Sequence, residues 1–248
     1  MHAFPAQHRD PRTGHAGLLV ARRIPAASAR LWLVELDATA AAIKAQHPRL
    51  AARWLTRSDI VRLARIRDRS ERDRRAATYI ALRILVAGLL GRRHALAPMI
   101  RPLGGKPRLA GVPIAFNLSH SGAFGLIGIA RRGHVGVDME DARSLPMTPR
   151  NRTRLVEAAR ALGRSTDLVP DRDRDVLQAW TRLEAFSKAT GRGINRTLAD
   201  FGIRKQADAR LHTPGATIAE RAARQLPRYE TRDLALPLGI RASLARGL

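Results

Sequence analysis

One arrangement occurs twice along this chain of 248 residues: a strand followed, at the same distance, by a helix that a glycine closes. The strand that ends at Asp37 is followed 46 residues later by Arg83, and Asp138 is followed 46 residues later by Glu184. Both pairs are offset by 101 positions, although the two segments share too few identical residues to establish a duplication. We therefore expect an α+β fold of two similar halves related by pseudo-two-fold symmetry, with the active site in the cleft between them.

The boundary between the expected halves lies in the link after the central hairpin. This boundary divides the chain into an N-terminal α+β half at 1–132, expected to contact nucleotide and phosphate, and a C-terminal α+β half at 133–248, expected to carry the metal carboxylates. Apolar periodicity and turn residues predict helices at 59–66, 72–90, 153–162 and 175–190, and strands at 30–36, 114–119, 124–130, 135–140, 198–204, 210–212 and within 228–245. A turn is predicted at 103–107 and a polar loop at 165–175.

The amino-acid composition indicates the kind of cellular compartment in which the protein works. The chain has no cysteine, which excludes disulfides and thiolate metal sites and is typical of a reducing compartment. The N-terminal residues lack the apolar core of a signal peptide, and no apolar run is long enough to span a membrane. We expect a cytoplasmic monomer that does not enter a membrane.

The charge of the chain is strongly positive, with a formal net value of +24. Only four of the 45 basic residues are lysines, so part of this balance follows from an Arg- and Ala-rich composition. Eight arginines lie between positions 57 and 75, which indicates either a solvated helix face or a phosphate-binding segment. In both cases the surface should attract anions such as phosphates, nucleic acid or an acidic protein.

Two acidic residues at the end of an apolar strand suggest a metal site. Alternate side chains of a strand share a face, so Asp138 and Glu140 should project to the same side. With Glu184 from the helix they would supply the oxygen ligands that magnesium prefers. The alternative is that the two strand residues simply end the strand at the surface.

The Ser-His pair at positions 119 and 120 does not form a hydrolase site. Neighbours on a strand point to opposite faces, so Ser119 cannot use His120 as its base. Both residues could instead hydrogen-bond phosphate oxygens, or His120 could have a purely structural role. Lys106 follows two glycines without the spacing of a Walker loop. Glu184 and Lys188 are four residues apart, which could mean only a salt bridge within one helix.

Several of these segments together resemble one family. They are Gly-Lys-Pro at 105–107, Phe-Asn-Leu-Ser-His-Ser at 116–121, Val-Gly-Val-Asp-Met-Glu at 135–140, Trp-Thr-Arg-Leu-Glu-Ala-Phe-Ser-Lys at 180–188 and Gly-Arg-Gly at 191–193. In this order they resemble the surfactin-synthetase-activating (Sfp-type) 4'-phosphopantetheinyl transferases. The family fold has two similar α+β halves in one chain, which agrees with the repeat.

The resemblance implies transfer of 4'-phosphopantetheine from coenzyme A to a serine of an acidic acyl or peptidyl carrier protein, releasing adenosine 3',5'-bisphosphate. It implies that Glu184 and Lys188 are catalytic, with Glu184 taking the serine proton. The implied magnesium ligands are Asp138, Glu140 and Glu184. The implied coenzyme A contacts are Lys188 on the pyrophosphate, Ser119 and His120 on phosphate oxygens, Lys106 near the nucleotide, and arginines from Arg67 to Arg75 near the 3'-phosphate.

Two departures from the family pattern bear on activity. The family usually has lysine immediately before the helical glutamate, where this chain has Leu183. Arg182 is no automatic substitute, because one helical step rotates a side chain by about 100°. We expect Leu183 to belong to the core. The segment 151–173 also lacks the family's aromatic pair near the carrier-docking region.

The residues alone also allow an alternative from a different class of protein. An arginine-rich nucleic-acid-binding protein without catalytic activity would explain the charge, with the acidic residues serving structure. The three Trp and two Tyr residues are scattered, however, and no nucleic-acid-binding motif is present. Nucleic acid is therefore not the partner that we expect.

Overall fold

The computed structural model describes residues 19–26, 29–46, 53–102, 105–163, 167–204, 217–224 and 228–247. The strands are β1 (Ala21–Ile24), β2 (Arg30–Glu35), β3 (Met99–Ile100), β4 (Arg108–Leu109), β5 (Ala115–Ser121), β6 (Phe124–Ala130), β7 (Val135–Glu140), β8 (Tyr229–Asp233) and β9 (Arg241–Gly247). The helices are α1 (Leu36–Gln46), α3 (Arg57–Ala64), α4 (Arg69–Leu90), α5 (Arg92–Ala95), α6 (Pro149–Gly163), α7 (Asp173–Thr190), α8 (Ile194–Asp200) and α9 (Ile218–Ala223).

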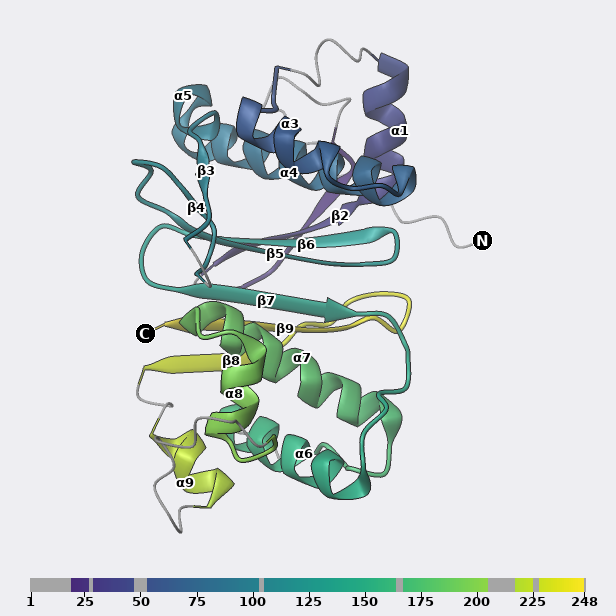
Figure 1. Ribbon diagram of the computed structural model, residues 1–248, viewed down its shortest axis with the longest axis vertical. Helices are drawn as coiled ribbons and strands as arrows, with labels where there is room; N and C mark the ends of the chain where they lie inside the picture. Colours follow the sequence, from purple (N-terminus) through teal and green to yellow (C-terminus); the bar gives the residue numbers. More distant parts are fainter. Residues whose placement is uncertain are drawn as a thin grey trace.

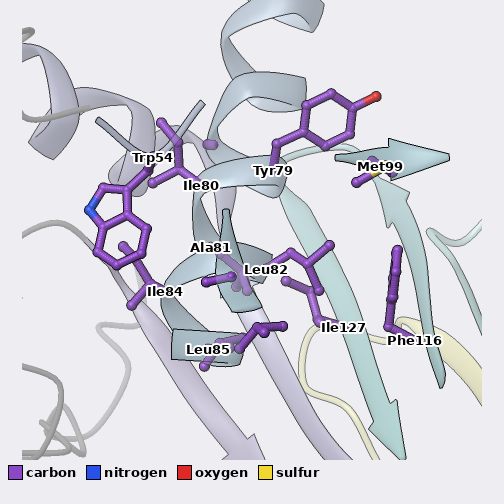
Figure 2. Close-up of a cluster of buried hydrophobic side chains, with 14 of the residues drawn as sticks. Trp54, Tyr79, Ile80, Ala81, Leu82, Ile84, Leu85, Met99, Phe116 and Ile127 are labelled. Atoms are coloured by element: carbon purple, nitrogen blue, oxygen red, sulfur yellow. The ribbon is translucent and has the colours of Figure 1, made fainter. Parts of the chain in front are cut away.

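The first part of the chain folds as a sheet covered by helices on one face. The sheet has the order β1-β2-β6-β5 with antiparallel pairing throughout, and β3 pairs separately with β4. Helix α4 buries a continuous apolar face against this sheet, and Figure 2 shows its residues Ile80, Leu82 and Ile84 together with Phe116 and Ile127 of the strands. Burial of large apolar side chains of this kind contributes roughly 1.5–3 kcal/mol each.

The second part also consists of a sheet and helices, and its sheet has three strands. Its sheet has the order β7-β9-β8, again antiparallel, and α7 lies across β7 and β9. The core of this part includes Leu155 and Val156 of α6 together with Leu177, Leu183 and Phe186 of α7. The result is an α+β protein, as the sequence predicts.

The two sheets lie between the two helical layers, so the molecule is layered helix, sheet, sheet, helix (Figure 1). A third apolar cluster fills the space between the sheets and joins Leu31, Leu33 and Leu126 to Val137 and Leu244. The pseudo-two-fold relation and the division at 132/133 stay predictions.

Polar side chains tie the edges of the two sheets together. The Asn117 side-chain oxygen accepts a hydrogen bond of 2.8 Å from the Val137 backbone N–H, and the Ser121 hydroxyl accepts one of 3.0 Å from the N–H of Asp141. Between them, the Ser119 hydroxyl lies 3.3 Å from the N–H of Met139. Each of these contacts lies two residues further along both segments than the one before it. The strands β5 and β7 therefore run in the same direction. The alternating polar residues of β5 thus satisfy backbone donors of β7.

The sequence-based elements are confirmed where the periodicity is strong. The helix predicted at 72–90 is α4, closed by Gly91, and the hairpin at 114–130 is β5 and β6. The helix predicted at 175–190 begins two residues earlier, at Asp173, within the predicted loop, and ends at Gly191 in a left-handed conformation with φ of 73°.

One interpretation of the sequence is wrong, one is confirmed except at its last residue, and one lies outside the described residues. The strand predicted at 198–204 is instead the end of α8 followed by turns, which bury Leu198, Phe201 and Ile203. The strand predicted at 30–36 ends at Glu35, and Leu36 starts α1, a helix that the sequence reading missed. The predicted strand at 210–212 falls outside the described residues. Among the described helices, none is both long and apolar enough to cross a membrane.

Candidate active site

A pocket of about 480 Å³ opens where β5, β7 and α7 meet. It is lined by residues from both parts of the chain: Arg75, Thr78, Arg101, Gly105, Lys106, Pro107, Asn117, Leu118, Ser119, His120, Asp138, Met139, Glu140, Glu184, Ser187, Lys188, Gly191, Gly193 and Ile194. All of the residues predicted for the site are among them except the arginines before Arg75, of which Arg67 was named. Arg67 is exposed in the link between α3 and α4 and does not line the pocket.

Gly136 explains how α7 comes close enough to β7 to share a pocket with it. A Cβ atom at this position would lie 2.0 Å from the Ala185 carbonyl oxygen and 2.4 Å from the Ala189 nitrogen, both backbone atoms. Only glycine allows the helix to pack at this distance. This close packing places Glu184 and Lys188 near the carboxylates of β7.

Asp138 is the central acidic group of the pocket, and its side chain is nearly enclosed. Its Oδ1 accepts hydrogen bonds from the Ser119 hydroxyl at 2.8 Å and from Lys188 Nζ at 2.6 Å. Its Oδ2 is buried and has no hydrogen-bond partner among the described residues. Burial raises the pKa of Asp138, against the opposing effect of Lys188.

The helical pair behaves differently from a simple salt bridge within one helix. Lys188 forms its ion pair with Asp138 of β7, whereas Glu184 lines the pocket one turn earlier on α7. Burial raises the pKa of Glu184 to about 7, and the nearby Asp138 and Glu140 add to this while Lys188 opposes it. A carboxylate with a pKa near neutrality is suited to accept and release a proton.

This shift predicts a pH-dependent effect of replacing Glu184 with glutamine. Below about pH 4.5 the glutamic acid is neutral in both the folded and the unfolded chain, so the two proteins should be equally stable. Between pH 4.5 and about 7 the unfolded chain loses its proton first, and the wild type loses stability as the pH rises. At pH 8, Glu184→Gln should be more stable by roughly 1–3 kcal/mol, since one pKa unit corresponds to 1.36 kcal/mol.

Urea unfolding at pH 4.5 and pH 8, without added metal, measures this difference. Glu157→Gln makes the same chemical change at an exposed position of α6 and should leave the stability unaltered at both values. An equal stability of Glu184→Gln and wild type at pH 8 would contradict the assigned environment of Glu184.

Two of the three carboxylates predicted to hold magnesium are engaged by cationic side chains. Glu140 receives two hydrogen bonds from Arg143, and Asp138 Oδ1 is engaged by Lys188. Accordingly, no group of three Asp, Glu, His or Cys side chains in the described part of the chain is gathered closely enough to hold a metal ion. The oxygen donors are nevertheless of the chemical kind that a hard cation prefers, and the buried Asp138 Oδ2 has no partner among the described residues.

Cationic groups line the same pocket as the carboxylates. Lys106 donates from Nζ to the Val135 carbonyl oxygen, and burial lowers its pKa to about 8. Arg75 Nη2 lies 2.7 Å from His120 Nε2, and Glu71 contacts both of these residues. An anionic ligand would therefore meet Arg75 of α4, Lys188 of α7 and Lys106 around the carboxylates.

Some lining residues were missed by the sequence reading. Arg101 follows β3 and lines the pocket, but it belongs to no recognised motif. The sequence signal that could have identified Arg101 was its position shortly before the Gly-Lys-Pro segment. Leu183, by contrast, is fully buried in the core of the second part, as predicted. Arg182, next to it, donates to both carboxylate oxygens of Asp233 and does not line the pocket.

The arginine-rich segment is only partly free to bind anions. Arg62 donates to the Met99 carbonyl oxygen, Arg72 to that of Ile66, and Arg74 to both carboxylate oxygens of Asp37. These side chains serve the fold. Of the eight arginines between positions 57 and 75, Arg75 alone lines the pocket.

Comparisons with known proteins give one consistent result. No protein-family model matches the chain. A Synechocystis protein provisionally assigned as a 4'-phosphopantetheinyl transferase is 29% identical over 158 residues, which are 61% of this chain and 64% of that protein. The 4'-phosphopantetheinyl transferases AcpT of Salmonella typhimurium and Salmonella typhi are each 36% identical over 123 residues, which are 47% of this chain and 60% of theirs.

The chain is similar to 4'-phosphopantetheinyl transferases. Its matches span 60–64% of the length of these curated relatives. The similarity supports the broad transferase family and does not distinguish the Sfp-type subgroup from others.

Proposed function

We propose that this chain is an Sfp-type 4'-phosphopantetheinyl transferase. It moves 4'-phosphopantetheine from coenzyme A to a serine of an acyl or peptidyl carrier protein and releases adenosine 3',5'-bisphosphate. The observation that carries this proposal is the single pocket in which Asp138, Glu140 and Glu184 stand beside Lys106 and Lys188. Phosphoryl transfer depends on this combination, because it needs positioning and charge neutralisation more than covalent catalysis.

Each side chain of the pocket has a role in the proposed reaction. The carrier serine Oγ forms a bond to the phosphorus that bears pantetheine, and the bond from this phosphorus to the leaving adenosine 3',5'-bisphosphate breaks. Glu184, which lines the pocket, takes the serine proton. Lys188 holds the pyrophosphate, and Ser119 and His120 bind further phosphate oxygens. Lys106 lies near the nucleotide.

Magnesium is the proposed metal of this site. Asp138, Glu140 and Glu184 would hold it, and the ion would neutralise pyrophosphate charge when bound. Two present contacts have to open for this ligand set, namely Arg143 with Glu140 and Lys188 with Asp138. Lys188 is then released to bind the pyrophosphate.

A direct transfer assay tests the proposal. The purified chain is incubated with coenzyme A, magnesium and acyl and peptidyl carrier proteins in their unmodified form, and the carriers are weighed by mass spectrometry. We expect one phosphopantetheine adduct per carrier, located on a serine, and no adduct when a chelator replaces magnesium. Unmodified carriers, together with thermal stabilisation by duplex DNA and none by coenzyme A, would favour the nucleic-acid-binding alternative.

Charge should steer the proposed partner, an acidic carrier protein that meets a monomeric transferase in the cytoplasm. A chain of net charge +24 attracts such a carrier, and salt screens the attraction over about 10 Å at 0.1 M ionic strength. The apparent KM for carrier should therefore rise several-fold between low and high salt, while kcat at saturating carrier changes little. A flat KM would mean that the net charge has no part in docking.

A further inference from the structure

One arginine engages both carboxylate oxygens of Glu140. Glu140 is the last residue of β7 and lines the pocket, whereas Arg143 lies three residues later, in the segment that leads from β7 to α6 (Figure 1). Arg143 Nη2 donates to Oε1 at 2.9 Å, and its Nε donates to Oε2 at 3.3 Å. Two bonds of this kind hold a carboxylate more firmly and in a more defined orientation than one. This bonding raises the pKa of Arg143, so the pair is charged.

The segment that carries Arg143 is fixed to the fold on both sides of this residue. Before it, the Asp141 backbone N–H donates to the Ser121 hydroxyl at 3.0 Å, which ties the segment to β5. After it, the Ser144 side chain hydrogen-bonds Asp173, the first residue of α7. The guanidinium is therefore held near the end of β7 by the path of the chain, although Arg143 itself is about half exposed.

The proposed reaction gives Arg143 no other task. Lys188, which engages Asp138, binds the pyrophosphate in that reaction, but Arg143 does not line the pocket and reaches it only through Glu140. A divalent cation at Glu140 would use the same oxygens and would be repelled by the charge of the arginine. The Glu140 side chain is only 21% exposed, so solvent screens this opposition incompletely.

We infer that Arg143 is a positioning residue for the metal site: it competes with the divalent cation for Glu140 and thereby lowers the affinity of the empty pocket for metal. The competition accounts for the arrangement of the carboxylates, which in the described part of the chain are not gathered closely enough to hold an ion. The inference deepens the proposed function, because it rests on the metal ligands proposed there.

The test compares Mn²⁺ binding by Arg143→Gln and by wild type at pH 8 and constant salt, without coenzyme A or carrier protein. Mn²⁺ takes the same oxygen ligands as magnesium, and its free ion can be counted by electron paramagnetic resonance. Arg241→Gln is the matched control. Arg241 is the partner of Glu140 across the β7–β9 pair, yet no hydrogen bond or ion pair joins the two side chains in the described part of the chain. Both variants therefore remove one arginine charge beside Glu140, but only Arg143→Gln removes a bond to it.

Arg143→Gln should bind Mn²⁺ about three- to fivefold more tightly than wild type, as expected when a partly exposed ion pair no longer has to open. Arg241→Gln should stay within about twofold of wild type, because salt screens a charge that makes no contact. Unfolding cannot imitate the expected result, which is a gain of binding. Unchanged or weaker binding by Arg143→Gln overturns the inference, and equal tightening by Arg241→Gln does so too.

A third variant identifies the site that is being measured. Glu140→Gln removes the carboxylate for which the arginine and the metal compete, and it should weaken Mn²⁺ binding. If Glu140→Gln binds Mn²⁺ as wild type does, the ion is held elsewhere and the inference fails. Absence of Mn²⁺ binding by both wild type and Arg143→Gln also overturns it, since there is then no metal for Arg143 to oppose.

The metal titration is independent of the transfer assay. If Arg143→Gln tightens Mn²⁺ binding but no carrier protein is modified, the inference about Arg143 stands and the proposed function fails. If carriers are modified, Arg143→Gln should also lower the magnesium concentration that gives half-maximal transfer by a similar factor. Carrier modification with an unchanged magnesium requirement would leave the proposed function standing and reject the role of Arg143.

Discussion

Asp138→Asn is expected to lower carrier modification at least about a hundredfold without unfolding the protein. Asp138 Oδ1 holds both Ser119 and Lys188, and in the proposed reaction its carboxylate is a metal ligand. Loss of one preorganised charged group at a reacting centre typically costs 10²–10³ in rate. The fold should tolerate the change, because burial already disfavours the charged form of Asp138 and asparagine has the same shape.

Initial rates at saturating coenzyme A and magnesium, together with the urea midpoint, separate the two effects. Asp141→Asn is the matched control: it follows β7, carries the same group and does not line the pocket. It should retain nearly full activity. If Asp138→Asn is within threefold of wild type, Asp138 is not part of the reacting centre and the proposed metal site fails with it.

The strongly periodic elements were predictable from the sequence because local rules decide them. Helix α7 has an apolar face, acidic residues in its first turn and Gly191 after its end, and the reading differed only at its start. The strand predicted at 198–204 was wrong for a physical reason. Leu198, Phe201 and Ile203 can be buried by an alternating strand or by a short helix with a turn at Gly202, whose φ is 71°, and tertiary packing decided for the helix.

The candidate site was predictable as a set of residues but not as a set of contacts. Sequence spacing pairs Lys188 with Glu184, whereas in the structure Lys188 binds Asp138. That pairing depends on the close approach of α7 to β7 at Gly136, which no local rule reveals. Ser119 was expected to meet phosphate, but its hydroxyl donates to Asp138 and lies near the N–H of Met139. The juxtaposition of β5 and β7 creates these partners.

The two parts of the predicted repeat differ most clearly in the environments of positions 83 and 184. Arg83 and Glu184, which the predicted repeat pairs, lie 101 positions apart, on α4 and α7. Glu184 lines the pocket with a raised pKa, whereas Arg83 is fully buried with Asp59. Its Nη2 and Nε lie 2.6 and 2.9 Å from Asp59 Oδ2, and it also donates to the carbonyl oxygens of Ala95 and Ala97.

Arg83→Met should therefore destabilise the fold by about 3–5 kcal/mol, since removing one partner leaves the other charge buried and unpaired. Asp59 would keep its capping contacts with Thr56 at the start of α3 but lose its cation. The free energy of unfolding in urea at pH 7 measures the loss. Arg74→Met on the same helix removes an arginine from an exposed pair with Asp37 and should cost less than about 1 kcal/mol.

The double variant Arg83→Met with Asp59→Asn distinguishes an unpaired charge from lost packing. Asparagine can still accept from Thr56 but carries no charge, so the double variant should recover a large part of the stability that Arg83→Met loses. If the double variant is as unstable as Arg83→Met, packing of the arginine stem and its bonds to the two carbonyl oxygens carry the effect. If Arg83→Met itself lies within 1 kcal/mol of wild type, the buried pair does not stabilise the first part of the chain, and the contrast between positions 83 and 184 has no energetic basis.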